Sequence, residues 1–284
     1  MENNQANITS RIFVEQRTPI FFSVIDNFFT SYLPIDLQEL ESVALLDRRE
    51  EKFLIPNKWC ANIAESLDSE YNILEINNER KFRYDNLYFD TPGNICLEDH
   101  LRGRKIRYKV RIRSYANSNI SFLEVKSRNV HGRSIKMRLQ RTSEKWDSPL
   151  TKEERRFLTE RVSFARELSP VLYSSYSRFT LAHIKRGERI TFDTGLKFKS
   201  IEGVVFYPLD GLSIVELKQG ESDRHSPLHK LFRAHPNRHV PLGRTIRISK
   251  YVVGRLSTDT SLHARTYFES LRELNRASKS AQIS

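Results

Sequence analysis

Short segments in which apolar and polar residues alternate run through most of this chain. The clearest is KIRYKVRIRSY, residues 105–115. Its apolar positions are Ile106, Tyr108, Val110 and Ile112, and its basic positions are Arg107, Lys109, Arg111 and Arg113. Successive side chains of a strand point to opposite faces, so the pattern predicts a β-strand with one buried face and one cationic face. Nothing on that strand neutralises the cations, which repel one another.

Comparable patterns predict the other elements. Strands are expected at 48–55, 121–128, 134–140, 172–183, 188–192, 203–209, 213–218 and 244–253, and through most of 82–115 on both sides of a turn at 90–93. Helices are expected in 20–46 (two, broken at Pro34), 57–67, 151–168 and 260–275. Strands and helices do not alternate, which argues against a doubly wound parallel sheet. We therefore expect an α+β fold: an antiparallel β-barrel or strongly curved sheet, with helices at the termini and packed outside.

Charged residues, mostly Arg and Lys, share one face on strand after strand. These faces hold Glu50 and Lys52; Glu124, Lys126 and Arg128; Lys136 and Arg138; Tyr176 and Arg178; Arg189 and Asp193; Glu216 and Lys218. In one closed barrel such faces either all meet solvent or all line the interior. An interior of this kind needs a polyanion, because burying unpaired charges costs several kcal/mol each. Phosphate suits it, since Arg offers a planar fork and Lys a point charge. The pattern leaves both arrangements open.

Composition narrows the partners. The 284 residues carry a formal net charge of +12, so the expected partners are anions: nucleic acid, an acidic membrane surface or phosphorylated molecules. The two cysteines, Cys60 and Cys96, have neither metal-site spacing nor a disulfide framework, which favours a reducing, intracellular setting. No apolar run is long enough to cross a bilayer and no secretory segment begins the sequence, so we expect a cytoplasmic protein.

Nine motifs occur in the order of a known family. They are RREEKF (48–53), LYFDTP (87–92), YKVRIRSY (108–115), LEVK (123–126), IKMR (135–138), YSR (176–178), RITFD (189–193), VELK (215–218) and SKY (249–251). Each is weak alone. Together they make the chain resemble the vacuolar transporter chaperone (VTC) domain, the polyphosphate polymerase branch of the triphosphate tunnel metalloenzyme (CYTH-like) superfamily. The resemblance implies a tunnel domain over 45–256, between an N-terminal helical segment (1–44) and a C-terminal helix and tail (257–284).

The resemblance also implies a reaction and roles for residues. ATP would donate its γ-phosphoryl group to a growing polyphosphate chain inside the tunnel. The implied catalytic residues are Lys52, Arg111, Arg113, Lys126, Arg178 and Lys250. The implied substrate-binding residues are Glu50, Lys109, Glu124, Lys136, Arg138, Tyr176, Arg189, Lys218 and Ser249. Glu216 would coordinate Mn²⁺ or Mg²⁺, and Arg107 and Lys109 would lie near a tunnel mouth. No side-chain nucleophile is required, because the acceptor phosphate attacks.

Two departures bear on the activity. Hydrolases and cyclases of the superfamily typically open with Glu-x-Glu-x-Lys, where this chain has Arg48-x-Glu50-x-Lys52. Losing the first carboxylate weakens a second metal site, which favours polymerase over hydrolase. Eukaryotic members carry a phosphate-sensing domain and membrane spans that these residues do not show, so we expect a stand-alone, prokaryotic-type member, with a separate membrane partner possible. The alternatives are a tunnel-fold triphosphatase and a non-enzymatic polyanion or nucleic-acid binder.

Overall fold

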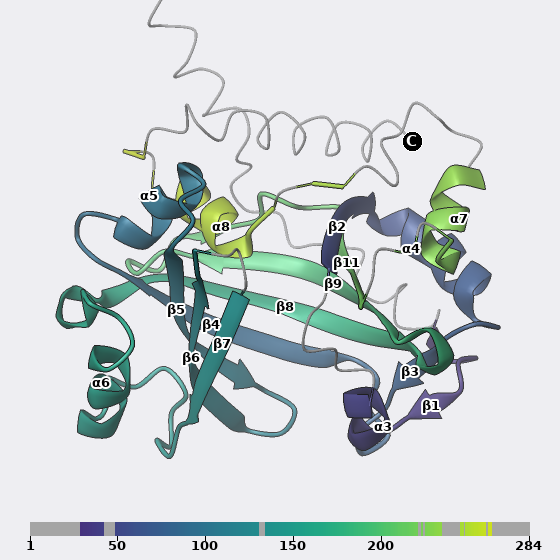
Figure 1. Cartoon of the computed structure of the whole chain (residues 1–284), viewed down its shortest axis with the longest axis horizontal. Coiled ribbons are helices and arrows are strands. Elements are labelled where there is room, and N and C mark those ends of the chain that lie inside the picture. The colour runs from purple at the N-terminus through teal and green to yellow at the C-terminus, as the bar shows by residue number, and fades with distance from the viewer. Residues whose placement is uncertain are drawn as a thin grey trace, which may run out of the picture.

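The computed structural model describes residues 29–42, 49–130, 134–220, 223, 225–234, 245–246, 248–259 and 261–262 (Figure 1). Its strands are β1 (Pro34–Ile35), β2 (Arg49–Pro56), β3 (Asn72–Leu74), β4 (Phe82–Asp90), β5 (Arg107–Tyr115), β6 (Ile120–Arg128), β7 (Ser134–Gln140), β8 (Ser169–His183), β9 (Glu188–Lys199), β10 (Val205–Phe206) and β11 (Leu212–Gln219). Its α-helices are α3 (Leu37–Ser42), α4 (Asn57–Leu67), α5 (Ile95–Leu101), α6 (Lys152–Thr159), α7 (Pro227–Ala234) and α8 (Lys250–Thr258), and its 3₁₀-helices are η2 (Ala165–Glu167) and η3 (Ile184–Arg186). The expected α+β class is confirmed.

The described strands form one sheet, whose main path runs β2-β11-β9-β8-β4-β5-β6-β7. Every pairing along this path is antiparallel. The register between β8 and β9 shifts between Ser175 and Ser177, and such irregularities bend and twist a sheet. The sheet curls strongly into a tunnel-like shape (Figure 1). Within the described residues its edge strands β2 and β7 do not pair with each other, so the sheet is curled but not closed.

Helices cover the outer face of the curl. Phe53 and Ile55 of β2 share one buried cluster with residues of α4 and α7, including Ile63 and Phe232. A second buried cluster joins the outward side chains of β4, β5 and β6 to Leu158 of α6. These apolar residues are one half of each alternating pattern, and each is worth about 1.5–3 kcal/mol on burial. Because helices take the apolar faces, the charged faces are left on the concave side.

One end of the concave face is apolar and is covered by α5 and α8, which share a buried cluster with β8, β9 and β11. Here the sequence-based prediction of a strand at 244–253 is wrong, since helix α8 begins at Lys250. Val252 and Val253 favour strands locally, but α8 buries every residue from 251 to 257. At Gly254 a Cβ atom would lie 2.5 Å from the side chains of Leu172 and Phe198, so the helix rests directly on the sheet. Tertiary packing overrides local propensity here.

Other differences from the expected elements are smaller. Strand β3 and helices α5 and α7 were not predicted, β10 is shorter than 203–209, and α6 covers only the start of 151–168. Pro34 begins the short strand β1, and the second expected N-terminal helix corresponds to α3. The first N-terminal helix and the helix at 260–275 fall largely or wholly outside the described residues. Among the described helices, none has the length and apolar character to span a membrane.

Candidate phosphate-binding site

The charged faces of the strands meet across the concave side of the sheet. The clearest contact is between Lys126 of β6 and Glu50 of β2, whose Nζ and Oε2 atoms lie 3.7 Å apart. These two strands stand far apart in the strand order, with β11, β9, β8, β4 and β5 between them. Their side chains can touch only across the inside of the curl. Of the two arrangements that the sequence left open, the structure therefore has the inward one.

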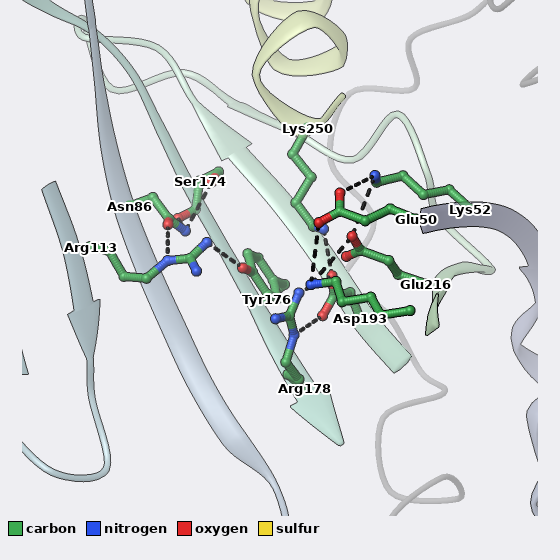
Figure 2. Close-up of polar contacts among 11 residues, drawn as sticks. Glu50, Lys52, Asn86, Arg113, Ser174, Tyr176, Arg178, Asp193, Glu216 and Lys250 are labelled. Carbon is green, nitrogen blue, oxygen red and sulfur yellow. Dashed lines mark hydrogen bonds and ion pairs between the residues drawn. The ribbon is translucent and has the colours of Figure 1, made fainter. Parts of the chain in front are cut away.

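Two carboxylates, Glu50 on β2 and Glu216 on β11, lie within one group of lysines (Figure 2). Lys52 Nζ lies 3.5 Å from Glu50 and 3.4 Å from Glu216. Lys218 Nζ lies 4.0 Å from Glu50 and 3.4 Å from Glu216. Burial alone would raise the pKa of Glu216, but Lys218 and Lys52 outweigh it and hold that pKa well below its ordinary value. The carboxylate of Glu216 therefore stays ionised.

Asp193 of β9 is fully buried and holds two cations in place (Figure 2). Arg178 of β8 donates from Nε and Nη2 to the two carboxylate oxygens, at 2.5 and 2.7 Å. Lys250, the first residue of α8, donates from Nζ to Oδ2 at 2.5 Å. Burial opposes ionisation of Asp193, but Arg178 and Lys250 outweigh it and lower its pKa to about 2. The helix that covers one end of the groove thus also contributes a cation to its floor.

Arg113 of β5 is oriented by neutral partners (Figure 2). Its Nε donates to Asn86 Oδ1 at 2.9 Å and its Nη2 donates to the hydroxyl of Tyr176 at 2.8 Å. The Tyr176 ring stacks on Tyr84, with centroids 5.3 Å apart and an interplanar angle of 4°. The guanidinium carbons of Arg113 and Arg178 lie 5.1 and 5.2 Å from the Tyr84 ring centre, within cation–π distance. Tyr84 of β4 therefore contacts arginines from the strands on both sides of it, β5 and β8.

Glu124 of β6 organises a third group. Arg111 of β5 donates from Nε and Nη2 to Oε2 at 2.8 and 2.7 Å, and Lys136 Nζ of β7 lies 2.5 Å from Oε1. Burial opposes ionisation of Glu124, but Arg111, Arg113 and Lys136 outweigh it and lower its pKa to about 2. Glu124 is thus a fixed counter-charge that holds two cations on the groove wall.

The remaining candidates vary in position. Lys109 lies near Lys126, Lys52 and Arg111, inside the cationic group. Arg189 is opposite Lys218 in the strand register. Arg138 is exposed, with its guanidinium carbon 4.8 Å from the Phe122 ring centre, and Ser249 precedes α8 without a side-chain capping bond. The structure therefore gathers most of the candidates around Glu50, Glu124 and Glu216, with Arg138 and Ser249 outside the described ion pairs. The roles of all the candidate residues remain predictions.

The sequence did not single out three residues that the structure places in this site: Asp193, Asn86 and Tyr84. Asp193 was visible as part of an alternating charged face, yet its bond to Lys250 spans 57 positions and has no sequence signal. Asn86 and Tyr84 share a strand face with Tyr88, which the period-two spacing could have indicated. Their partners, Arg113 and Tyr176, come from other strands, so their function depends on sheet register.

Glu50 and Glu216 are also the residues that fit a divalent cation. No group of three or more His, Cys, Asp or Glu that could hold a metal occurs within the described part of the chain. Mg²⁺, however, is usually bound by one or two carboxylates and completes its coordination with water and substrate phosphates. The two neighbouring carboxylates, both with lowered pKa, match that requirement. The donor set therefore suits a metal that binds together with a phosphate ligand.

A curled antiparallel sheet with interlocked cations and acids on its concave face defines a tunnel-type fold. The family model for the VTC domain matches residues 47–258, so the chain belongs to the VTC domain family. This confirms the family resemblance, and the matched range includes the strands that carry Glu50, Arg111 and Glu216.

Solved structures show a more distant likeness. A putative adenylyl cyclase from Hippeastrum, described as having a dominant triphosphatase activity, is 15% identical over 74% of this chain and 95% of its own, with a TM-score of 0.42. The PH1819 protein of Pyrococcus horikoshii is 14% identical over 72% and 97%, with a TM-score of 0.40. A putative adenylate cyclase from Bacillus halodurans is 14% identical over 65% and 86%, with a TM-score of 0.39. No curated protein matches the chain.

Proposed function

We propose that this protein is a metal-dependent phosphotransferase that moves the γ-phosphoryl group of ATP onto an inorganic polyphosphate chain lying in the concave groove. One observation carries the proposal: basic side chains outnumber acidic ones on the inside of the curl. The basic residues are Lys52, Lys109, Arg111, Arg113, Lys126, Lys136, Arg178, Lys218 and Lys250, and the acidic ones are Glu50, Glu124, Asp193 and Glu216. Such an excess in a partly buried groove calls for a polyanion.

The acids in the groove orient the cations more than they neutralise them. Arg178 donates two N–H groups to Asp193, and Arg113 donates one each to Asn86 and Tyr176. A guanidinium has five N–H groups, so each of these arginines has others that can bind a phosphate oxygen. Donors that are already held in position need no reorganisation when negative charge develops in the transition state. Arg178, Arg113 and Lys250 would therefore bind and align the transferring phosphoryl group.

The reaction needs no covalent intermediate on the protein. A terminal oxygen of the acceptor chain attacks the γ-phosphorus, a new P–O bond forms, the bond to the bridging oxygen of ATP breaks, and ADP leaves. Glu216, with Glu50, would hold a Mg²⁺ or Mn²⁺ ion, which supplies charge neutralisation at the phosphate oxygens. Lys52 and Lys218 lie beside both carboxylates and would bind phosphate at the same place. ATP and polyphosphate are the implied ligands.

The test is incubation of the protein with ATP and Mn²⁺ or Mg²⁺, with products separated on a gel and free orthophosphate measured in parallel. We expect polyphosphate chains and ADP, and a loss of at least about 100-fold in rate for Glu216→Gln. Glu65→Gln is the matched control, because Glu65 is exposed on the outer helix α4.

Two results would contradict the polymerase proposal. Stoichiometric orthophosphate without chains would indicate a triphosphatase. Salt-dependent binding of polyanions with no turnover, unaffected by Glu216→Gln, would indicate a binding protein without enzymatic activity.

A further inference from the structure

Asp90, the last residue of β4, joins the two helices that cover one end of the groove, and its side chain is fully buried. Its Oδ1 accepts from the backbone N–H groups of Thr91 and Cys96, at 2.8 and 2.9 Å, and its Oδ2 accepts from that of Leu97 at 3.0 Å. Cys96 and Leu97 belong to the first turn of α5, whose N–H groups lack partners within the helix. The hydroxyl of Tyr251, the second residue of α8, donates to the same Oδ2. One carboxylate therefore holds the first turns of both helices.

The hydroxyl of Tyr251 does more than fill space. The ring lies in the apolar cluster beneath α8 and tilts against the Tyr88 ring, with centroids 5.2 Å apart, a contact that a phenylalanine would also make. A buried hydroxyl costs free energy unless it is hydrogen-bonded, so Asp90 restricts where this side chain can lie. Burial, followed by the charge of Asp90, raises the pKa of Tyr251 well above its ordinary value, so the hydroxyl keeps its proton and donates.

Lys250 precedes Tyr251 in the same turn of α8, and its side chain reaches into the groove to Asp193 (Figure 2). Neighbouring residues of a helix point about 100° apart, so α8 has one anchor towards α5 and another towards β9. Ser249, just before the helix, forms no side-chain capping bond that would hold this turn. The ammonium lies at the end of a long side chain, so a small rotation of α8 about its axis would displace it from the groove floor.

We propose that Asp90 and Tyr251 are positioning residues for Lys250: their hydrogen bond fixes the rotation of the first turn of α8 and so fixes where the Lys250 ammonium meets a bound phosphate. This inference rests on the proposed function, in which Lys250 aligns the transferring phosphoryl group. Asp193 orients the ammonium locally, whereas the bond between Tyr251 and Asp90 fixes the backbone from which the lysine extends. Position matters for the rate, because a misplacement of about 1 Å can slow a reaction by about 100-fold.

A double-mutant cycle separates positioning from a purely structural role. The variants are Tyr251→Phe, Lys250→Met and the two together, with Asp90→Asn as a second way to disturb the same bond. Tyr32→Phe is the matched control, because Tyr32 is also buried and donates its hydroxyl to the carbonyl oxygen of Ala64 on the outer side of the sheet. Each protein is assayed for ATP turnover with Mn²⁺, for tripolyphosphate affinity by titration calorimetry and for melting temperature.

We expect Tyr251→Phe to lower turnover about tenfold and to weaken tripolyphosphate binding by a smaller factor. In the Lys250→Met background the same change should alter neither quantity, since no ammonium is left to position. Asp90→Asn should also slow turnover and should lower the melting temperature further than Tyr251→Phe, because it disturbs the first turn of α5 as well. Tyr32→Phe should lower the melting temperature about as much as Tyr251→Phe while turnover stays at the wild-type rate.

Equal losses from Tyr251→Phe with and without Lys250 would overturn the positioning role, as would a Tyr251→Phe protein that works like wild type. An equal loss of turnover in Tyr32→Phe would overturn it too, because lost stability alone would then explain the effect. If ATP yields orthophosphate without chains but the dependence on Lys250 persists, the polymerase proposal fails and the positioning role stands. If ATP is not turned over at all, the same cycle in tripolyphosphate affinity decides, and if wild type binds no tripolyphosphate, both proposals fail.

Discussion

Replacing Asp193 by Asn tests whether one buried carboxylate holds the groove cations in place. The substitution keeps the shape of the side chain and removes the charge that binds Arg178 and Lys250. A pKa of about 2 against an ordinary 3.8 corresponds to about 2–3 kcal/mol in favour of the ionised carboxylate. Leaving two cations without their buried partner costs about 3–5 kcal/mol. At about 2–4 °C per kcal/mol, the melting temperature should fall by about 6–20 °C.

Thermal and denaturant unfolding of the ligand-free protein measure this loss, with Glu160→Gln as the control. Glu160 pairs with Arg156, whose side chain is 82% exposed, and solvent screens such surface pairs so that they stabilise a protein little. Because the folded-state pKa of Asp193 lies below its unfolded value, its stabilisation is complete above about pH 4 and is lost as the pH falls towards 2. The melting temperatures of wild type and Asp193→Asn should therefore converge as the pH falls from about 4 towards 2. A loss no larger than that of Glu160→Gln at pH 7 would refute the assigned role of Asp193.

Tyr84→Leu should weaken tripolyphosphate binding about tenfold in calorimetry while Tyr84→Phe stays near wild type, because two guanidiniums lie over the ring; equal losses would contradict this. Burial lowers the pKa of Lys218 to about 8, and a bound anion would raise that pKa again. Above pH 8 the affinity of wild type for tripolyphosphate should therefore fall by up to about tenfold per pH unit relative to Lys218→Arg, whose guanidinium stays charged. Parallel pH profiles of the two proteins would argue against a phosphate contact by Lys218. Gly254→Ala should cost about 1–3 kcal/mol in denaturant unfolding, because its Cβ would lie 2.5 Å from Leu172, whereas Gly93→Ala, with no atom within 4 Å, should not.

Much of the sheet could be predicted from local pattern. Strands β2, β5, β6, β7 and β8 fall close to their expected ranges, because alternation of apolar and charged residues is a property of consecutive positions. Local pattern predicts the wrong element at Lys250. Its neighbours Val252 and Val253 indicate a strand, yet the segment is a helix because the apolar end of the groove buries it on several sides.

The candidate site also has some features that the sequence sets and others that only the tertiary structure sets. The chain itself determines that the strands carry a cationic face, and that Arg111 and Arg113 share that face with Arg107 and Lys109. Only the tertiary structure decides that the face is concave, since this follows from which side α4, α6 and α7 cover. It also decides the partners. Glu124 meets Arg111 while Lys126 meets Lys109, because register between strands, which local sequence does not encode, sets which charges lie opposite one another.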